Sequence, residues 1–183
     1  MEKIICFFCD ITGTLKGRNK NSDLDYKNLA SNLLKLMEKF EANYLLISLV
    51  STDKYDVVNN TKKELQDKLN SSVFLFNKIF FENGYIVDDK INYKRASKPD
   101  QIIEFLDELE KKFDIQSIIY ADDCEIFHEV IDSLAEEKNY RSKIISIIPQ
   151  KKEGLSELND LLESKILKKE KKIMFKDLNF NFL

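Results

Sequence analysis

The chain is poor in glycine, proline and histidine and contains no tryptophan: its 183 residues include 4 Gly, 2 Pro, 1 His and 3 Cys. So little glycine and proline argues against low-complexity or disordered character over most of the length. No apolar run approaches the roughly 18 residues of a membrane span, and no leader with a small-residue cleavage site is visible. Three cysteines without a second pair at metal-ligand spacing favour buried, reduced thiols. From these absences we expect a cytoplasmic protein that does not bind membranes.

The charges are nearly balanced, with 29 basic and 32 acidic side chains and a net charge of −3. This balance argues against nucleic-acid binding on charge alone. The length fits one domain with its own hydrophobic core. We therefore expect a single domain over residues 1–183, with a core at about 3–167 and a basic and aromatic tail over 168–183. A solvated helix end followed by aromatic side chains that dock on the core is the favoured interpretation of this tail.

Apolar runs alternate with amphipathic helical patterns, which is typical of βαβ units and a parallel sheet. We expect strands at about 3–9, 43–50, 115–120 and 143–148, and helices at about 24–41, 53–69, 97–112 and 154–167, with one more helix after Asp123. In that helix we expect Ile126 and Val130 to face inward and His128 to be exposed or to cap the helix. Short strand-like runs at 73–76 and 79–81 precede a hairpin of 85–87 and 91–93 beside an Asn-Gly turn signal. The pattern predicts an α/β, Rossmann-like three-layer sandwich with a central, mostly parallel sheet of about five strands and a small β-hairpin.

Four chemically distinctive features fall at the ends of predicted elements. Asp10 ends the first strand, Ser51 follows the second, Lys98 begins a helix, and Asp122-Asp123 follows a later strand. Open α/β sheets bind ligands at the carboxyl ends of their strands, so these side chains should meet at one edge. Taken singly, each has a plainer interpretation: Ser51 is a helix cap, Lys98 a surface lysine, and Asp122-Asp123 a helix N-terminus.

The string Asp10-Ile11-Thr12-Gly13-Thr14-Leu15 resembles the first motif of the haloacid dehalogenase (HAD) superfamily, DxDGT followed by an apolar residue. The order of all four features resembles HAD motifs one to four, over about residues 4–148. The run Phe81–Ile86 also resembles the turn and hairpin of the Cof-like branch, in which a large cap domain precedes the lysine of motif three. Only a few residues separate Tyr93 from Lys98 here, so we expect the cap to be minimal or absent.

The resemblance implies a Mg²⁺-dependent phosphatase in which Asp10 attacks the phosphoryl group and forms an aspartyl-phosphate. Lys98 and the metal would offset the repulsion between this carboxylate and the anionic substrate. The implied metal ligands are Asp10, the backbone carbonyl of Thr12, Asp122 and, directly or through water, Asp123. The implied phosphate-binding groups are the amides near Ile11 and Gly13, the hydroxyls of Ser51 and Thr52, and Lys98. Ser48 competes with Ser51 for this role, but Ser51 is preferred because it follows the strand.

One position departs from the superfamily pattern, because Thr12 stands where most HAD phosphatases have a second Asp that transfers protons. Thr12 cannot do this near neutral pH, and such proton transfer contributes on the order of 10²–10⁴-fold to rate. The P-type ATPases also have Thr here, in DKTGT, and DITGTL resembles that string; the missing membrane span excludes a pump.

Three interpretations stay open. The first is a slow or specialised phosphatase, for substrates that have good leaving groups or their own proton donor. The second is a HAD-fold binding or regulatory protein with weak catalysis, and the third is a phosphotransferase with a non-water acceptor. The phosphorylated substrate is a small molecule or a macromolecule. A site without a cap favours a macromolecule, or a partner subunit, including a second copy of the chain, that covers the pocket.

Overall fold

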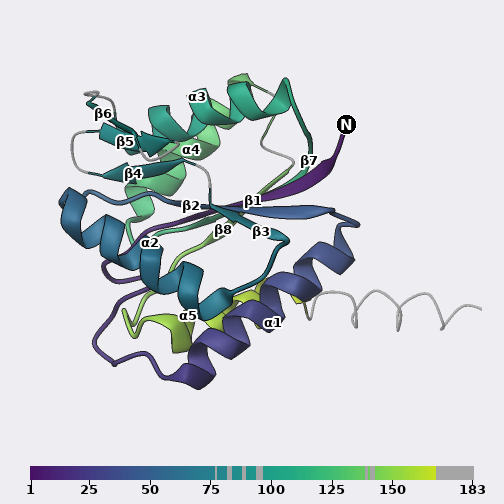
Figure 1. Cartoon of the computed structure of the whole chain (residues 1–183). Coiled ribbons are helices and arrows are strands. Elements are labelled where there is room, and N and C mark those ends of the chain that lie inside the picture. The colour runs from purple at the N-terminus through teal and green to yellow at the C-terminus, as the bar shows by residue number, and fades with distance from the viewer. Residues whose placement is uncertain are drawn as a thin grey trace, which may run out of the picture.

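The computed structural model describes residues 1–76, 78–81, 84–87, 90–93, 97–138, 140 and 143–167. The predicted tail over 168–183 lies outside the described residues, as does Asn83 of the Asn-Gly turn signal. The remaining predicted strands and helices all fall within them, so the expected architecture can be compared with the structure element by element (Figure 1).

A five-stranded parallel sheet forms the centre of the molecule, in the order β3-β2-β1-β7-β8. Its strands are β1 (Lys3–Cys9), β2 (Tyr44–Leu49), β3 (Phe74–Phe76), β7 (Asp114–Ala121) and β8 (Ile144–Ile147). From Ile4 onward every residue of β1 is buried, as a central strand covered on both faces requires. The strand order and the parallel pairing confirm the predicted α/β, Rossmann-like fold.

Helices cover both faces of this sheet and make the three layers (Figure 1). One core cluster joins α1 (Asp23–Lys39), α2 (Tyr55–Leu69) and α5 (Leu155–Leu162) to the side chains of Ile5, Phe7 and Cys9. The other joins α3 (Lys98–Glu110) and α4 (Glu125–Glu137) to Ile4, Cys6 and Phe8. A π-helical turn, η2 (Glu163–Leu167), continues α5. Successive residues of β1 thus alternate between two apolar cores, and this alternation fixes the register of the central strand.

A second, antiparallel sheet lies between β3 and α3 in the chain and beside α3 in space (Figure 1). It consists of β4 (Ile79–Phe81), β5 (Gly84–Val87) and β6 (Lys90–Tyr93). The predicted hairpin is confirmed as β5–β6, and β4 adds a third strand to it. This small sheet is tied to the main one, because the Ser51 amide donates to the Phe80 carbonyl at 3.3 Å. No larger cap lies among the described residues between β3 and α3.

The small sheet is also fastened to α3 by a buried lysine. The Lys78 ammonium lies 4.4 Å from the centroid of the Tyr85 ring and 5.0 Å from that of Phe105. It also forms an ion pair with Glu108 of α3 at 3.3 Å. A cation enclosed by aromatic faces contributes on the order of 1–2 kcal/mol when it is desolvated. The small sheet is therefore held against α3 by side-chain contacts of Lys78 as well as by the chain that connects them.

The orientation of α4 corrects one prediction. Ile126 and Val130 were expected to face inward, but they are 67% and 39% exposed, whereas His128 is buried. The His128 ring packs on the Tyr120 ring at 4.5 Å, and its Nε2 lies 2.9 Å from the Asp122 carbonyl oxygen. This polar contact turns the His128 face of the helix inward and carries two flanking apolar residues outward.

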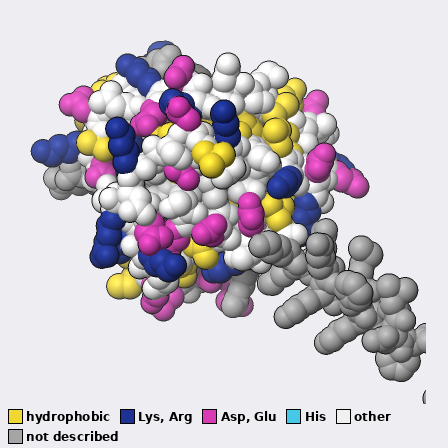
Figure 2. Space-filling view, turned by 90° about the horizontal axis from the view of Figure 1, so that it is seen from below, with side chains coloured by type: hydrophobic (Ala, Val, Ile, Leu, Met, Phe, Trp, Pro, Cys, Tyr) yellow, Lys and Arg dark blue, Asp and Glu magenta, His cyan; other side chains and the backbone are white. Residues whose placement is uncertain are grey.

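The surface has no large patch of one charge on the face drawn in Figure 2, where basic and acidic side chains are interspersed. Among the described residues, no helix is both long enough and apolar enough to cross a membrane.

Candidate functional site

Three adjacent parallel strands end at the same edge of the sheet, and each is followed by a predicted site residue. Asp10 follows β1, Ser51 follows β2 after one intervening residue, and Asp122 follows β7. Backbone bonds extend the sheet past these strand ends: the Asp10 amide donates to the Ala121 carbonyl at 2.8 Å, and the Asp122 amide donates to the Ile147 carbonyl at 3.2 Å. The positions of both carboxylates are therefore fixed by the sheet itself.

Lys98 joins the two carboxylates from the first turn of α3. Its ammonium donates to Asp10 Oδ1 at 2.9 Å and to Asp122 Oδ2 at 2.7 Å. The side chains are only 6%, 8% and 1% exposed for Lys98, Asp10 and Asp122. Ser97 caps the helix by accepting from the Asp100 amide, so Lys98 enters the site from a fixed helix start. The sequence prediction that these three residues converge agrees with this geometry.

Burial and the neighbouring charges shift the pKa values of Asp10 and Lys98 in this triad. Burial raises the pKa of Asp10 to about 7, and the neighbouring Asp122 charge adds to this rise while Lys98 opposes it. Burial alone would lower the pKa of Lys98, but the two carboxylates outweigh it and raise that pKa. The ammonium therefore stays protonated near neutral pH, where it faces two buried carboxyl groups.

Asp122 is held by more groups than Asp10 is. The Tyr120 hydroxyl donates to Asp122 Oδ2 at 2.7 Å, and the Cys124 amide donates to Oδ1 at 2.9 Å. Burial raises the pKa of the Tyr120 hydroxyl, with the Asp122 charge adding to the effect, so this hydroxyl stays a proton donor. Tyr120 and His128 thus position the strand end, a role that the sequence did not reveal.

Asp123 completes a group of three carboxylates with Asp10 and Asp122, whose oxygens lie within 4.8 Å of one another. The loop after β1 passes directly beneath it: Gly13 has φ +88°, and a Cβ there would overlap the Asp123 carboxylate. Only glycine combines this backbone conformation with so close an approach. Three hard oxygen donors with incompletely neutralised charge fit the preferences of Mg²⁺.

Lys152 is a second cation at this edge, and sequence analysis missed it. Its ammonium lies 2.7 Å from Asp123 Oδ2, although the side chain is 54% exposed. The loop that carries it is folded by Glu157, which accepts from the amides of Gln150, Lys151 and Glu153 at 2.8, 2.9 and 3.1 Å. These three bonds outweigh the effect of burial and lower the pKa of Glu157. Lys152 itself has φ +57°, a conformation that this loop enforces.

Thr12, which stands in place of the usual second Asp, forms a hydrogen bond with a carboxylate. The exposed Thr12 hydroxyl donates to Asp53 Oδ2 at 3.0 Å. The buried Ser51 hydroxyl donates to the same oxygen at 2.6 Å, and the Asp53 amide donates back to Ser51 Oγ at 3.1 Å. Nothing in the sequence around Asp53 indicated this contact with Thr12, which lies 41 residues away in the chain.

The other predicted phosphate-binding residues lie near the site without forming one cradle. Ile11 is buried in the core, and Thr52 is exposed. The Gly13 amide donates to the Lys16 carbonyl at 2.7 Å. Ser48 lies inside β2 with a buried hydroxyl that has no partner among the described residues. Of the two competing serines, only Ser51 lies at the strand end with the carboxylates.

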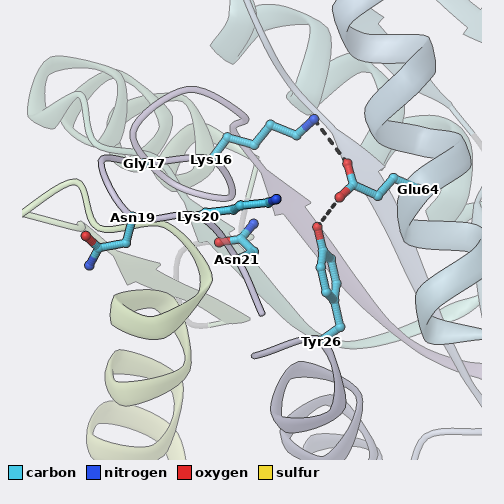
Figure 3. Close-up of a pocket in the computed structure, with 7 residues that line it drawn as sticks. All are labelled: Lys16, Gly17, Asn19, Lys20, Asn21, Tyr26 and Glu64. Atoms are coloured by element: carbon cyan, nitrogen blue, oxygen red, sulfur yellow. Dashed lines mark hydrogen bonds and ion pairs between the residues drawn. The ribbon is translucent and has the colours of Figure 1, made fainter. Parts of the chain in front are cut away.

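A cavity of about 240 Å³, lined mainly by polar and charged side chains, lies beside the site, between the loop after β1, the first turn of α1 and the middle of α2. Figure 3 shows Lys16 and Tyr26 converging on Glu64, and the ion pair between Lys16 and Glu64 measures 3.1 Å. Neither Lys98 nor the three carboxylates line this cavity. It adjoins the site through Lys16, whose carbonyl accepts from Gly13.

No protein-family profile matches the chain, and no curated protein matches it. Among solved structures, the HAD domain of the effector protein Lem4 from Legionella pneumophila is 13% identical, with a TM-score of 0.45 over 98% of this chain and 96% of that one. An inactive mutant of the same domain is 14% identical, with a TM-score of 0.46 over 99% and 95%. A hypothetical protein from Sulfolobus tokodaii is 10% identical, with a TM-score of 0.41 over 82% and 98%.

These comparisons leave the Cof-like branch and the P-type ATPase resemblance as predictions.

Proposed function

We propose that the chain is a Mg²⁺-dependent phosphohydrolase that acts through an aspartyl-phosphate on Asp10. The observation that carries this proposal is the buried triad in which Lys98 bonds both Asp10 and Asp122. A plain structural ion pair would not need the third carboxylate, Asp123, within 4.8 Å. Nor would it be expected at the carboxyl edge of a parallel sheet, where such folds bind ligands.

The chain's own residues have separate tasks in this reaction. Asp10 is the nucleophile, because it follows the central strand and its position is fixed by the Ala121 carbonyl. Lys98 neutralises part of the charge that accumulates as Asp10 approaches the phosphoryl group. Asp10, Asp122 and Asp123 would hold the Mg²⁺, which supplies further charge neutralisation when it is bound. Ser51 borders the phosphoryl position beside the end of β2.

The substrate is expected to have a good leaving group. The Thr12 hydroxyl is too weak an acid to protonate a leaving group near neutral pH, so the leaving oxygen departs without assistance from this position. Acyl-phosphates and aryl phosphates have leaving groups that are stable as anions. We therefore expect these classes to be hydrolysed much faster than alkyl phosphates, whose alkoxides need protonation.

The test is hydrolysis of acetyl phosphate and p-nitrophenyl phosphate by the purified protein with Mg²⁺. Asp10→Asn should abolish turnover and leave the far-ultraviolet circular dichroism spectrum unchanged. Asp56→Asn, an exposed residue in the first turn of α2, makes the same chemical change outside the triad and should keep turnover. Equal turnover by Asp10→Asn and the unchanged protein, or no turnover on a broad panel of phosphates, would contradict the proposal.

A second candidate, a protein that binds phosphorylated ligands with weak catalysis, is favoured by one observation. The Ser51 hydroxyl proton is directed to Asp53, and the Gly13 amide is directed to Lys16. Both donors must reorient before they can bind a phosphoryl oxygen. Saturable binding of inorganic phosphate with Mg²⁺, without turnover of any phosphate, would favour this candidate.

A further inference from the structure

Position 12, where most HAD phosphatases have a second Asp, is occupied by Thr12, but the carboxylate of Asp53, from the loop after β2, lies beside it. Thr12 is two residues after Asp10, and its hydroxyl donates to Asp53 Oδ2 at 3.0 Å. We propose that Asp53 is the general base that hydrolyses the aspartyl-phosphate, in place of the carboxylate missing at position 12. This inference rests on the proposed function, and it adds a catalytic residue to that site.

The position of Asp53 is built by three hydrogen bonds. Oδ2 accepts from the Thr12 hydroxyl and from the Ser51 hydroxyl, at 3.0 and 2.6 Å, and the Asp53 amide donates to Ser51 Oγ at 3.1 Å. Ser51 is itself buried at the end of β2, so the carboxylate is anchored to the sheet. Both hydroxyls bond Oδ2, and since no residue that the structure describes bonds Oδ1, this oxygen is left to accept a proton from water. Groups held by their neighbours in this way lose little freedom when they react.

The contacts also indicate which proton transfer Asp53 performs. Both contacts bring hydroxyl donors to Oδ2, and this arrangement suits an ionised carboxylate, a group that only accepts hydrogen bonds. An ionised carboxylate accepts protons and does not supply them. Asp53 therefore acts after the leaving group has gone, in the second half of the reaction.

The step balances as follows. A water molecule attacks the phosphorus of the aspartyl-phosphate, and the bond between phosphorus and the Asp10 oxygen breaks. The water gives one proton to Asp53 Oδ1, its oxygen stays on phosphorus, and inorganic phosphate leaves. Asp10 returns to the carboxylate, and the proton on Asp53 passes to solvent. No proton donor acts in the first half, which agrees with a substrate whose leaving group departs as an anion.

The experiment is pre-steady-state hydrolysis of p-nitrophenyl phosphate, with Mg²⁺, by Asp53→Asn. Asparagine keeps an acceptor for Thr12 and Ser51 but cannot act as the base. We expect a burst of about one equivalent of p-nitrophenol per protein, followed by turnover at least about 10²-fold slower than that of the unchanged protein. A hydroxylamine-labile phosphoryl adduct should accumulate on Asp10, as detected by intact-protein mass spectrometry. Asp56→Asn, the matched control on α2, should show neither effect.

A double variant tests whether Asp53 replaces the missing carboxylate. Thr12→Asp in the Asp53→Asn protein should restore steady turnover and remove the adduct. An adduct that persists in the double variant would contradict this replacement. If Asp53→Asn kept its turnover, or if it lost both the burst and the turnover, Asp53 would not be the general base. Neither result would contradict the proposed phosphatase function itself. If Asp10→Asn turned over substrate as fast as the unchanged protein, the proposed phosphatase function would be overturned, and this inference with it.

Discussion

The Lys98 ammonium lies 2.7 Å from Asp122 Oδ2, and the two side chains are 6% and 1% exposed. Since the same ammonium also bonds Asp10, one cation offsets two buried carboxylates. Removal of one partner from a buried ion group leaves charge without compensation, which costs much more than loss of an exposed pair.

Lys98→Met should therefore lower the free energy of unfolding by about 3–5 kcal/mol. The measurement is urea unfolding without metal, at a pH above the Asp10 pKa of about 7. The control is Lys138→Met, which removes an exposed pair with Asp107 at 3.0 Å and should cost at most about 1 kcal/mol. Similar losses in the two variants would show that the triad is not a buried charge group.

The lowered pKa of Glu157 makes the free energy of unfolding depend on pH. Its folded-state pKa is lowered from 4.5 by three backbone amides, so its contribution to stability is complete above pH 4.5 and is lost as pH falls through the folded-state pKa. Glu157→Gln should be less stable near neutrality and should lose less stability on acidification. Thermal unfolding between about pH 3 and pH 7 measures both effects. Glu129→Gln, an exposed change on α4, should follow the unchanged protein; a steeper acid loss in Glu157→Gln would contradict the expectation.

Metal affinity should respond in opposite directions to changes on the two sides of one ion pair. Asp123→Asn removes a carboxylate from the group of three and should weaken Mg²⁺ binding by about tenfold or more. Lys152→Met removes the ammonium at 2.7 Å from Asp123 and should tighten Mg²⁺ binding. Isothermal titration calorimetry measures both, with the exposed Lys151→Met as the control. Weaker binding in Lys152→Met would mean that Lys152 supports the metal rather than competes with it.

The three thiols should differ in reactivity. Cys6 and Cys9 are buried, and burial raises the pKa of Cys6 to about 12 and that of Cys9 well above its ordinary value. Cys124 is partly exposed. An aromatic disulfide reagent should label one cysteine rapidly in the native protein and all three in denaturant, and peptide mapping should identify Cys124. Rapid native labelling of Cys6 or Cys9 would show that the β1 core opens readily.

The regular elements were predictable because their signals are local. The apolar run of β1 and the capping serine of α3 each lie within a few residues of the element that they define. The predicted site residues Asp10, Lys98 and Asp122 were predictable for a related reason: parallel strand ends meet at one edge, so topology alone brings them together.

The remaining features depend on contacts between segments far apart in the chain. Thr12 and Asp53 are 41 residues apart, and Lys152 reaches Asp123 only because Glu157 folds the loop between β8 and α5. The burial of His128 also has no local signal, since the apolar pattern of α4 favours Ile126 and Val130 on the inner face. Polar partners decide these positions, and hydrophobic periodicity does not report them.

The attachment of the small sheet has a kinetic consequence. Phe80 of β4 accepts from the Ser51 amide, and Lys78 fastens the sheet to α3 through Glu108, so its described strands form a fixed wall and not a hinged lid. Substrate binding would then require no movement of this sheet. Association should then follow a single exponential phase whose rate rises linearly with substrate concentration, without the plateau that a closing step imposes.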